Sequence, residues 1–238
     1  IQTADVGWEI YSKTGKAEDL GMLALVLALP MLTLSLPAGQ WADRYSRKKL
    51  FLFMQVMAGT CAVGLTLVST IHHDHPQWLY MMYALLALGA AGATIGRPSR
   101  EALMSGLVAA KIYPNAVTWN SSTFELSGMI GPAIGGMIVW AGGPNVAYGT
   151  AACFWVAAFV LIAQLPDSNP GASATRKAGF AELAEGLRFV WKTKLLLATL
   201  SLDLFAVLFG GAAYLLPIFS KDILHVGPFG FGCLRTAG

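Results

Sequence analysis

The stretch Gly39-Gln40-Trp41-Ala42-Asp43-Arg44-Tyr45-Ser46-Arg47-Lys48-Lys49 separates two long apolar runs and decides how the chain is arranged. Residues 20–38 before it and residues 50–71 after it contain no acidic or basic side chain. A charge-free run of about 18 or more apolar residues predicts a membrane-spanning helix, because roughly 20 residues at 1.5 Å each cross the hydrocarbon. The basic segment 39–49 is therefore predicted to be a short turn at a membrane surface.

The composition indicates an integral membrane protein. Of the 238 residues, 55% are hydrophobic and 12% are charged, whereas about 25% of residues are charged in soluble domains. The net charge of +3 comes from basic residues dispersed among the predicted loops, so we expect no nucleic-acid partner. The sequence contains no phosphate-binding loop, metalloprotease motif or hydrolase motif, and we expect a protein that is not an enzyme and needs no cofactor or metal ion.

The hydropathy pattern predicts an all-α membrane protein with seven spans, the first of them incomplete at its beginning. The predicted spans are 1–11, 20–38, 50–71, 78–96, 116–140, 146–165 and 195–219. Residues 166–194 are polar, begin rich in Pro, Gly and Ser, and are expected to form a linker with an amphipathic helix from Phe180 to Trp191. The expected organisation is thus a first bundle at 1–165, a linker at 166–194 and the start of a second bundle at 195–238.

The distribution of Lys and Arg predicts which side of the membrane each loop faces. Most of them fall in alternate loops, beginning with the basic segment, and short loops rich in Lys and Arg stay in the cytoplasm. We therefore expect the basic segment and the linker 166–194 to be cytoplasmic and the loop 72–76 to lie outside. That loop contains His72, His73 and His75, but its setting predicts no metal site.

The pattern Gly39-x-x-x-Asp43-Arg44-x-x-Arg47-Lys48 resembles the loop motif between the second and third helices of the major facilitator superfamily (MFS). This resemblance implies that Gly39 allows close helix approach and that Asp43 faces the positive end of a helix in the second bundle. It also implies that Arg47 pairs with an acid near the fourth helix, with Glu101 as the candidate. Together with Arg44 these residues would form a latch that holds the outward-open state. Ser46 departs from the family pattern, which usually has Gly there.

A second stretch, Ser127-Gly128-Met129-Ile130-Gly131-Pro132-Ala133-Ile134-Gly135-Gly136, resembles the Gly-Pro-x-x-Gly-Gly motif of MFS exporters that exchange substrate for protons. Small residues four apart allow helices to pack closely, and a proline bends a helix. The usual leading Gly is Ser127 here, with Gly128 one place off. We therefore expect Gly128, Gly131, Pro132, Gly135 and Gly136 to form a helix-packing motif.

Further stretches refine the resemblance. The fourth span carries no Arg, unlike many drug and proton exchangers of the superfamily. Residues 7–11 and 97–103 look more like the enterobactin-exporter-like branch. The resemblance implies the MFS fold, covering a first six-helix bundle, the seventh helix and the start of the eighth.

Three acids within the predicted spans are candidates for proton coupling: Asp5, Glu125 and Asp203. A charge at the middle of a membrane helix costs about 2.5–3.5 kcal/mol, so a carboxyl there favours its neutral form until water reaches it. The structural alternative is an acid kept neutral or hydrogen-bonded to a neighbouring helix. Glu9, one turn after Asp5, is expected to lie hydrated near the outer end of the first helix.

These features predict a secondary transporter of a bacterial inner membrane. The predicted activity is proton-coupled efflux of small siderophore-like or drug-like molecules by alternating access. Its partners would be the substrate, protons and the lipid bilayer, and we expect a monomer. An uptake symporter shares the same fold, and a membrane scaffold or receptor that transports nothing is the alternative from another class.

Overall fold

The computed structural model describes residues 2–71, 77–166, 188–210 and 215–236. Within these residues the chain is helical and contains no strand, which confirms the predicted all-α fold. The helices are α1 (Gln2–Thr14), α2 (Ala17–Arg44), α3 (Arg47–Ile71), α4 (Trp78–Leu107), α5 (Tyr113–Gly142), α6 (Pro144–Ala163), α8 (Lys194–Gly210), α9 (Leu216–Ile218), the π-helix η2 (Phe219–Ile223) and α10 (Pro228–Thr236).

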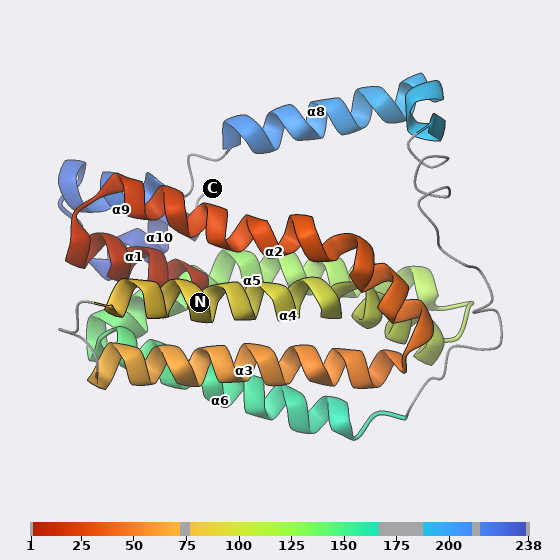
Figure 1. Ribbon diagram of the computed structural model, residues 1–238, viewed down its shortest axis with the longest axis horizontal. Coiled ribbons are helices and arrows are strands. Elements are labelled where there is room, and N and C mark those ends of the chain that lie inside the picture. Colours follow the sequence, from red (N-terminus) through yellow and green to blue (C-terminus); the bar gives the residue numbers. More distant parts are fainter. Residues whose placement is uncertain (1, 72–76, 167–187, 211–214, 237–238) are drawn as a thin grey trace.

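The long helices α2 to α6 lie side by side in an elongated bundle (Figure 1). Within it α3 packs against α4 and α6, and α2 packs against α4. The short helices α1, α9, η2 and α10 gather at one end, called here the α10 end. The turn between α2 and α3 lies at the opposite end, called here the basic end, and α8 lies apart from the bundle.

Five of these helices are long and apolar enough to cross a membrane. They correspond to the second through sixth predicted spans and are 17–35, 47–71, 78–107, 113–142 and 144–163. The prediction of a multi-pass membrane protein is confirmed. Large apolar side chains remain exposed on the outside of the bundle, such as Leu32 of α2 and Phe154 of α6, as expected for helices that face lipid.

Two helix ends differ from the sequence prediction at the basic end. Helix α2 continues through the first half of the basic segment to Arg44, and only Tyr45 and Ser46 separate it from α3. Tyr45 has an extended backbone, with φ −102° and ψ 161°, which ends the helix. Helix α4 runs to Leu107 rather than to 96, with Pro98 inside it. Hydropathy predicts where a helix leaves the membrane. It does not predict where the helix ends, because a helix can continue through the polar residues that follow.

The seventh predicted span, 195–219, is described in two parts, before residue 211 and after residue 214. Helix α8 covers 194–210, and the chain after residue 214 forms the short elements α9 and η2. Pro217 lies at the start of α9, where a missing backbone N–H is tolerated. Most of the predicted linker, 167–187, lies outside the described residues, and residues 188–192 are helical.

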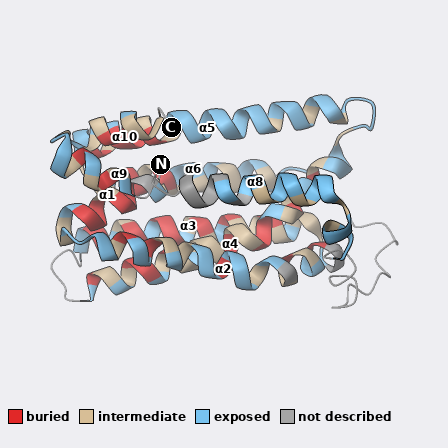
Figure 2. Ribbon diagram, turned by 90° about the horizontal axis from the view of Figure 1, so that it is seen from above, coloured by how far each residue is buried: buried red, intermediate tan, exposed pale blue. Residues whose placement is uncertain are grey.

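Burial is concentrated where α1 meets the long helices. Figure 2 shows α1 largely buried, whereas α8 and the first half of α5 are exposed. The apolar core joins residues of α1, α2, α3, α4 and α6. Its members include Val6, Ile10, Leu23, Leu65, Met82 and Tyr148. The α10 end is therefore the tightly packed end of the molecule.

Candidate functional site

Asp5 lies on α1 in the contact between α1 and α5. The residue is only 2% exposed, and its Oδ2 has no hydrogen-bond partner among the described residues. The carboxyl lies directly against Gly135 of α5, since a Cβ on Gly135 would stand 2.7 Å from Asp5 Oδ1 and 3.0 Å from Oδ2. A buried carboxyl without a partner is costly in its charged form. Of the three predicted proton-coupling acids, Asp5 is the one that the described structure buries.

Glu9, one turn further along α1, is the centre of a buried polar network. It is 1% exposed, so the expectation that it lies hydrated is wrong. The Ser69 hydroxyl of α3 donates to Glu9 Oε1 at 2.8 Å, and the Tyr148 hydroxyl of α6 donates to Oε2 at 2.6 Å. Lys13 Nζ lies 3.0 Å from Oε1 and 3.9 Å from the centre of the Trp78 ring of α4. Glu9 can be buried because α1, α3 and α6 supply its partners.

The other two candidate acids are exposed in the described structure. Glu125 lies in the exposed first half of α5, where every residue from 121 to 130 is exposed. Asp203 is exposed on α8, which lies apart from the bundle (Figure 1). The structure therefore does not bring Asp5, Glu125 and Asp203 together, and the roles of the last two remain predictions.

The glycine motif of α5 makes two different contacts. Gly135 faces Asp5 of α1, as described above. Gly136 faces α10, where a Cβ on Gly136 would stand 2.5 Å from the carbonyl oxygen of Pro228, and a Cβ on Gly232 would stand 2.5 Å from the carbonyl oxygen of Pro132. Such distances require glycine on both helices. Pro132 is buried and Gly131 half-buried, whereas Gly128 is exposed with no atom within 4 Å of its Cβ position.

The α10 end also joins α1 to the elements that follow α8. The Tyr11 hydroxyl donates to the Asp222 carboxylate of η2, and Lys221 Nζ donates to the Ser12 carbonyl at 3.0 Å. The Trp8 ring stacks on the Phe231 ring of α10 with 5.5 Å between centroids. A cavity of about 480 Å³ at this end is lined in part by Trp8, Glu9 and Lys13.

The basic segment forms hydrogen bonds to backbone carbonyls. Arg47 Nη1 donates to the carbonyl of Ala102 in α4 at 3.0 Å, and Lys48 Nζ donates to the carbonyls of Ala163 at 2.8 Å and Leu165 at 2.5 Å. The segment thus joins the start of α3 to the last turns of α4 and α6, where the partial negative charge of each helix lies.

Of the other predicted latch residues, Gly39 and Glu101 have no such contact in the described structure. Glu101 is exposed, and among the described residues it forms no ion pair with Arg47 within 4 Å. No described atom lies within 4 Å of the Cβ position of Gly39. Asp43 and Arg44 form the last turn of α2, and their side chains are outside the described part of the chain. The latch roles remain predictions.

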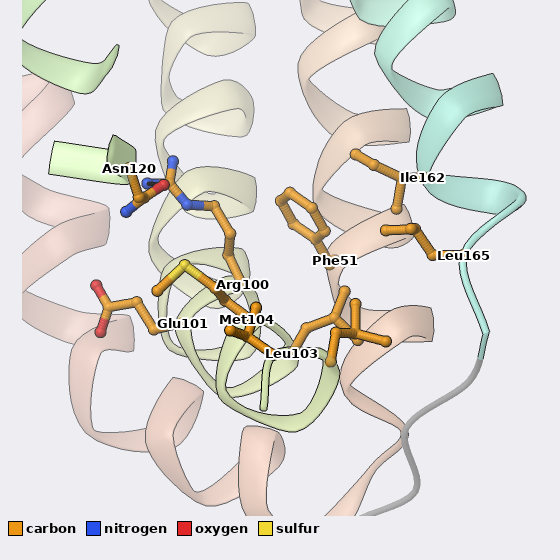
Figure 3. A pocket seen from close by; sticks show the side chains of 10 residues that line it. Phe51, Arg100, Glu101, Leu103, Met104, Asn120, Ile162 and Leu165 are labelled. Carbon is orange, nitrogen blue, oxygen red and sulfur yellow. Dashed lines mark hydrogen bonds between the residues drawn. The ribbon is translucent and has the colours of Figure 1, made fainter. Parts of the chain in front are cut away.

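A pocket of about 420 Å³ opens at the basic end between α3, α4, α5 and α6 (Figure 3). Arg100 reaches across it and donates to Asn120 Oδ1 at 3.1 Å, whereas Phe51, Ile162 and Leu165 lie on the other side. Most of the lining is apolar, including Leu103 and Met104. Apolar clefts with a few polar groups are typical of sites for small molecules.

A helical bundle with five candidate spans indicates a polytopic membrane protein, and a buried carboxyl and a glycine-lined contact between α5 and α10 lie at one of its ends. The family described as "Transmembrane secretion effector" matches residues 1–238. The chain belongs to this family, which is part of the major facilitator superfamily and consists of transporters rather than enzymes.

Curated relatives come from several bacteria. The multidrug efflux pump Tap of Mycobacterium tuberculosis is 25% identical over 97% of this chain and 57% of its own length. Macrolide efflux protein A of Streptococcus pyogenes is 23% identical over 91% of this chain and 53% of its own length. An MFS-type transporter of Bacillus subtilis, YfiS, is 27% identical over 76% of this chain and 43% of its own length. The chain thus spans about half the length of these relatives.

Proposed function

We propose that the chain forms part of a proton-coupled efflux transporter for small molecules, in which Asp5 carries the proton. The observation that supports this role is the burial of the Asp5 carboxyl, whose Oδ2 has no hydrogen-bond partner among the described residues. A carboxyl closed off from water favours its neutral form, and it releases a proton when a conformational change exposes it to water. Alternating access provides that change, because rocking of two bundles opens the site to each side in turn.

The direction of transport is inferred from the relatives and the motif. Tap and macrolide efflux protein A are named as efflux proteins. The stretch that resembles the exporter motif packs α5 closely against α10. The apolar pocket with Arg100, Glu101 and Asn120 suits small amphipathic substrates. The excess of Lys and Arg at the basic end supports a cytoplasmic position for that end, in the inner membrane.

The test is transport by the full-length protein in proteoliposomes under an imposed pH gradient. A fluorescent amphipathic dye serves as substrate, and an internal pH probe reports proton movement. We expect dye and protons to move in opposite directions, and Asp5→Asn to abolish the proton-driven part while dye still equilibrates down its own gradient. Glu18→Gln is the matched control, because Glu18 is an exposed acid at the start of α2.

Three results would contradict the proposal. Undiminished proton-driven efflux by Asp5→Asn would exclude Asp5 as the proton carrier. Movement of dye and protons in the same direction would indicate an uptake symporter. Absence of any dye or proton flux from protein that is correctly folded would favour a membrane protein that transports nothing.

A further inference from the structure

The two adjacent glycines of the α5 motif face different helices. Gly135 meets the Asp5 carboxyl of α1, and Gly136 meets the backbone of α10 at Pro228 and Gly232. Consecutive helix residues point about 100° apart, because an α-helix has 3.6 residues per turn. One short stretch of α5 therefore contacts the predicted proton site on one side and an element of the following bundle on the other.

The space at Gly135 is filled by the Asp5 carboxyl itself. A Cβ on Gly135 would overlap both carboxyl oxygens, at 2.7 Å and 3.0 Å, and its three nearest atoms all belong to the Asp5 carboxyl. Asp5 has one short side chain, is 2% exposed, and lacks a hydrogen-bond partner at Oδ2. The position of the carboxyl is thus determined by the space available to it. No described group forms a hydrogen bond with Oδ2, and the absence of a side chain on Gly135 provides the space that the carboxyl fills.

We propose that Gly135 is a positioning residue for the proton site. Because Gly135 has no side chain, the Asp5 carboxyl can occupy the space beside it, and there it takes up and releases a proton. This inference rests on the proposed proton-carrying role of Asp5. The step is the reversible transfer of one proton between water and the Asp5 carboxylate. Gly136 has a separate role, which is to hold α5 against α10.

Among the described residues, the charged and titratable groups that face Asp5 come from three helices. Glu9 lies one turn away on α1, Tyr148 faces it from α6 and Arg235 from α10, whereas α5 contributes Gly135. Glu9 is held by the Ser69 and Tyr148 hydroxyls and by Lys13, so its position does not depend on Gly135. A substitution at Gly135 therefore moves Asp5 relative to these groups without removing any of them.

The experiment follows the Asp5 carboxyl directly by its infrared C=O stretching band in the reconstituted full-length protein. The band is assigned by its loss in Asp5→Asn and is titrated against pH. In Gly135→Ala we expect the midpoint of the band to move by about one pH unit or more, a tenfold change in proton affinity, because the carboxyl is forced into different surroundings. The pH profile of dye efflux should move with it.

Two other glycines of α5 provide controls. Gly128→Ala adds the same methyl group where no described atom lies within 4 Å, and its band should titrate as in the wild type. Gly136→Ala pushes against the backbone of α10, which contributes Arg235, so we expect a loss of thermal stability and a smaller movement of the Asp5 midpoint than in Gly135→Ala. A wild-type midpoint in Gly135→Ala would overturn the inference and leave the role of Asp5 intact. If Asp5→Asn removes no titrating band, the proposed function itself fails.

The double variant Asp5→Ala with Gly135→Ala keeps the inference testable if Gly135→Ala alone does not fold. Removing the carboxyl frees the space that the new methyl group needs, so the double variant should fold and reach the yield of Asp5→Ala. If the double variant misfolds as the single variant does, Gly135 is required for another reason and the inference is wrong.

Discussion

The buried network around Glu9 at the α10 end and the basic segment at the opposite end bind their neighbours in different ways. At the α10 end, side chains bind other side chains in buried positions, as in the network of Glu9 with Ser69 and Tyr148. At the basic end, Arg47 and Lys48 bind backbone carbonyls at half-exposed positions. A side-chain network requires specific residues on several helices, whereas a carbonyl accepts a hydrogen bond from any donor that reaches it. We therefore expect substitutions to be far more damaging at the α10 end.

The largest effect is expected for Glu9→Ala. This substitution leaves Lys13 without its ion-pair partner and removes the acceptor of the Ser69 and Tyr148 hydroxyls in a buried site. Breaking a buried ion pair costs about 3–5 kcal/mol of stability. Thermal unfolding of the purified full-length protein measures the loss, with Glu18→Ala as the exposed control. A melting temperature equal to that of the wild type would show that the buried network at the α10 end does not contribute the stability expected of it.

The sequence predicts the spans well because the hydropathy of each span depends only on residues that are consecutive in the chain. The absence of charge in residues 20–38 and 50–71 predicts a membrane-spanning helix in each. The basic segment marks the end at which the two helices meet. Helix ends are harder to predict, since α4 continues past Pro98 and carries Arg100 and Glu101 outside the apolar run.

The candidate site could be predicted only in part. Asp5 is recognisable as an acid in an apolar helix, but nothing local indicates that Glu9 is buried, because its partners are 60 and 139 residues away in the chain. The glycine motif predicts close packing without saying which helix each glycine meets. That Gly135 meets Asp5 and Gly136 meets α10 follows only from how three helices come together.

A smaller effect is expected at the basic end for Arg47→Ala. Its guanidinium donates to the Ala102 carbonyl, and a hydrogen bond that involves a charged group contributes about 1.5–3 kcal/mol when buried. Arg47 is half-buried, so we expect about 1 kcal/mol in thermal unfolding, with exposed Arg97→Ala as the control. Glu101→Gln distinguishes the two partners: it should leave stability unchanged, whereas a loss as large as that of Arg47→Ala would indicate the ion pair that the family resemblance implies.

The smallest effect is expected for Lys48→Ala, and it tests why three basic residues stand at the start of α3. Cations at a helix N-terminus are unfavourable, because that end of the helix carries partial positive charge. Lys48 offsets this by reaching the carbonyls of Ala163 and Leu165, where α6 ends with partial negative charge. We expect a loss of about 0.3–1 kcal/mol that shrinks as salt is added. Lys49→Ala is the matched control, because its exposed side chain forms no such bond to α6 and its removal should leave stability unchanged or slightly raised. Equal losses from both substitutions would mean that the basic segment acts by net charge, and the contacts with α6 would then contribute nothing of their own.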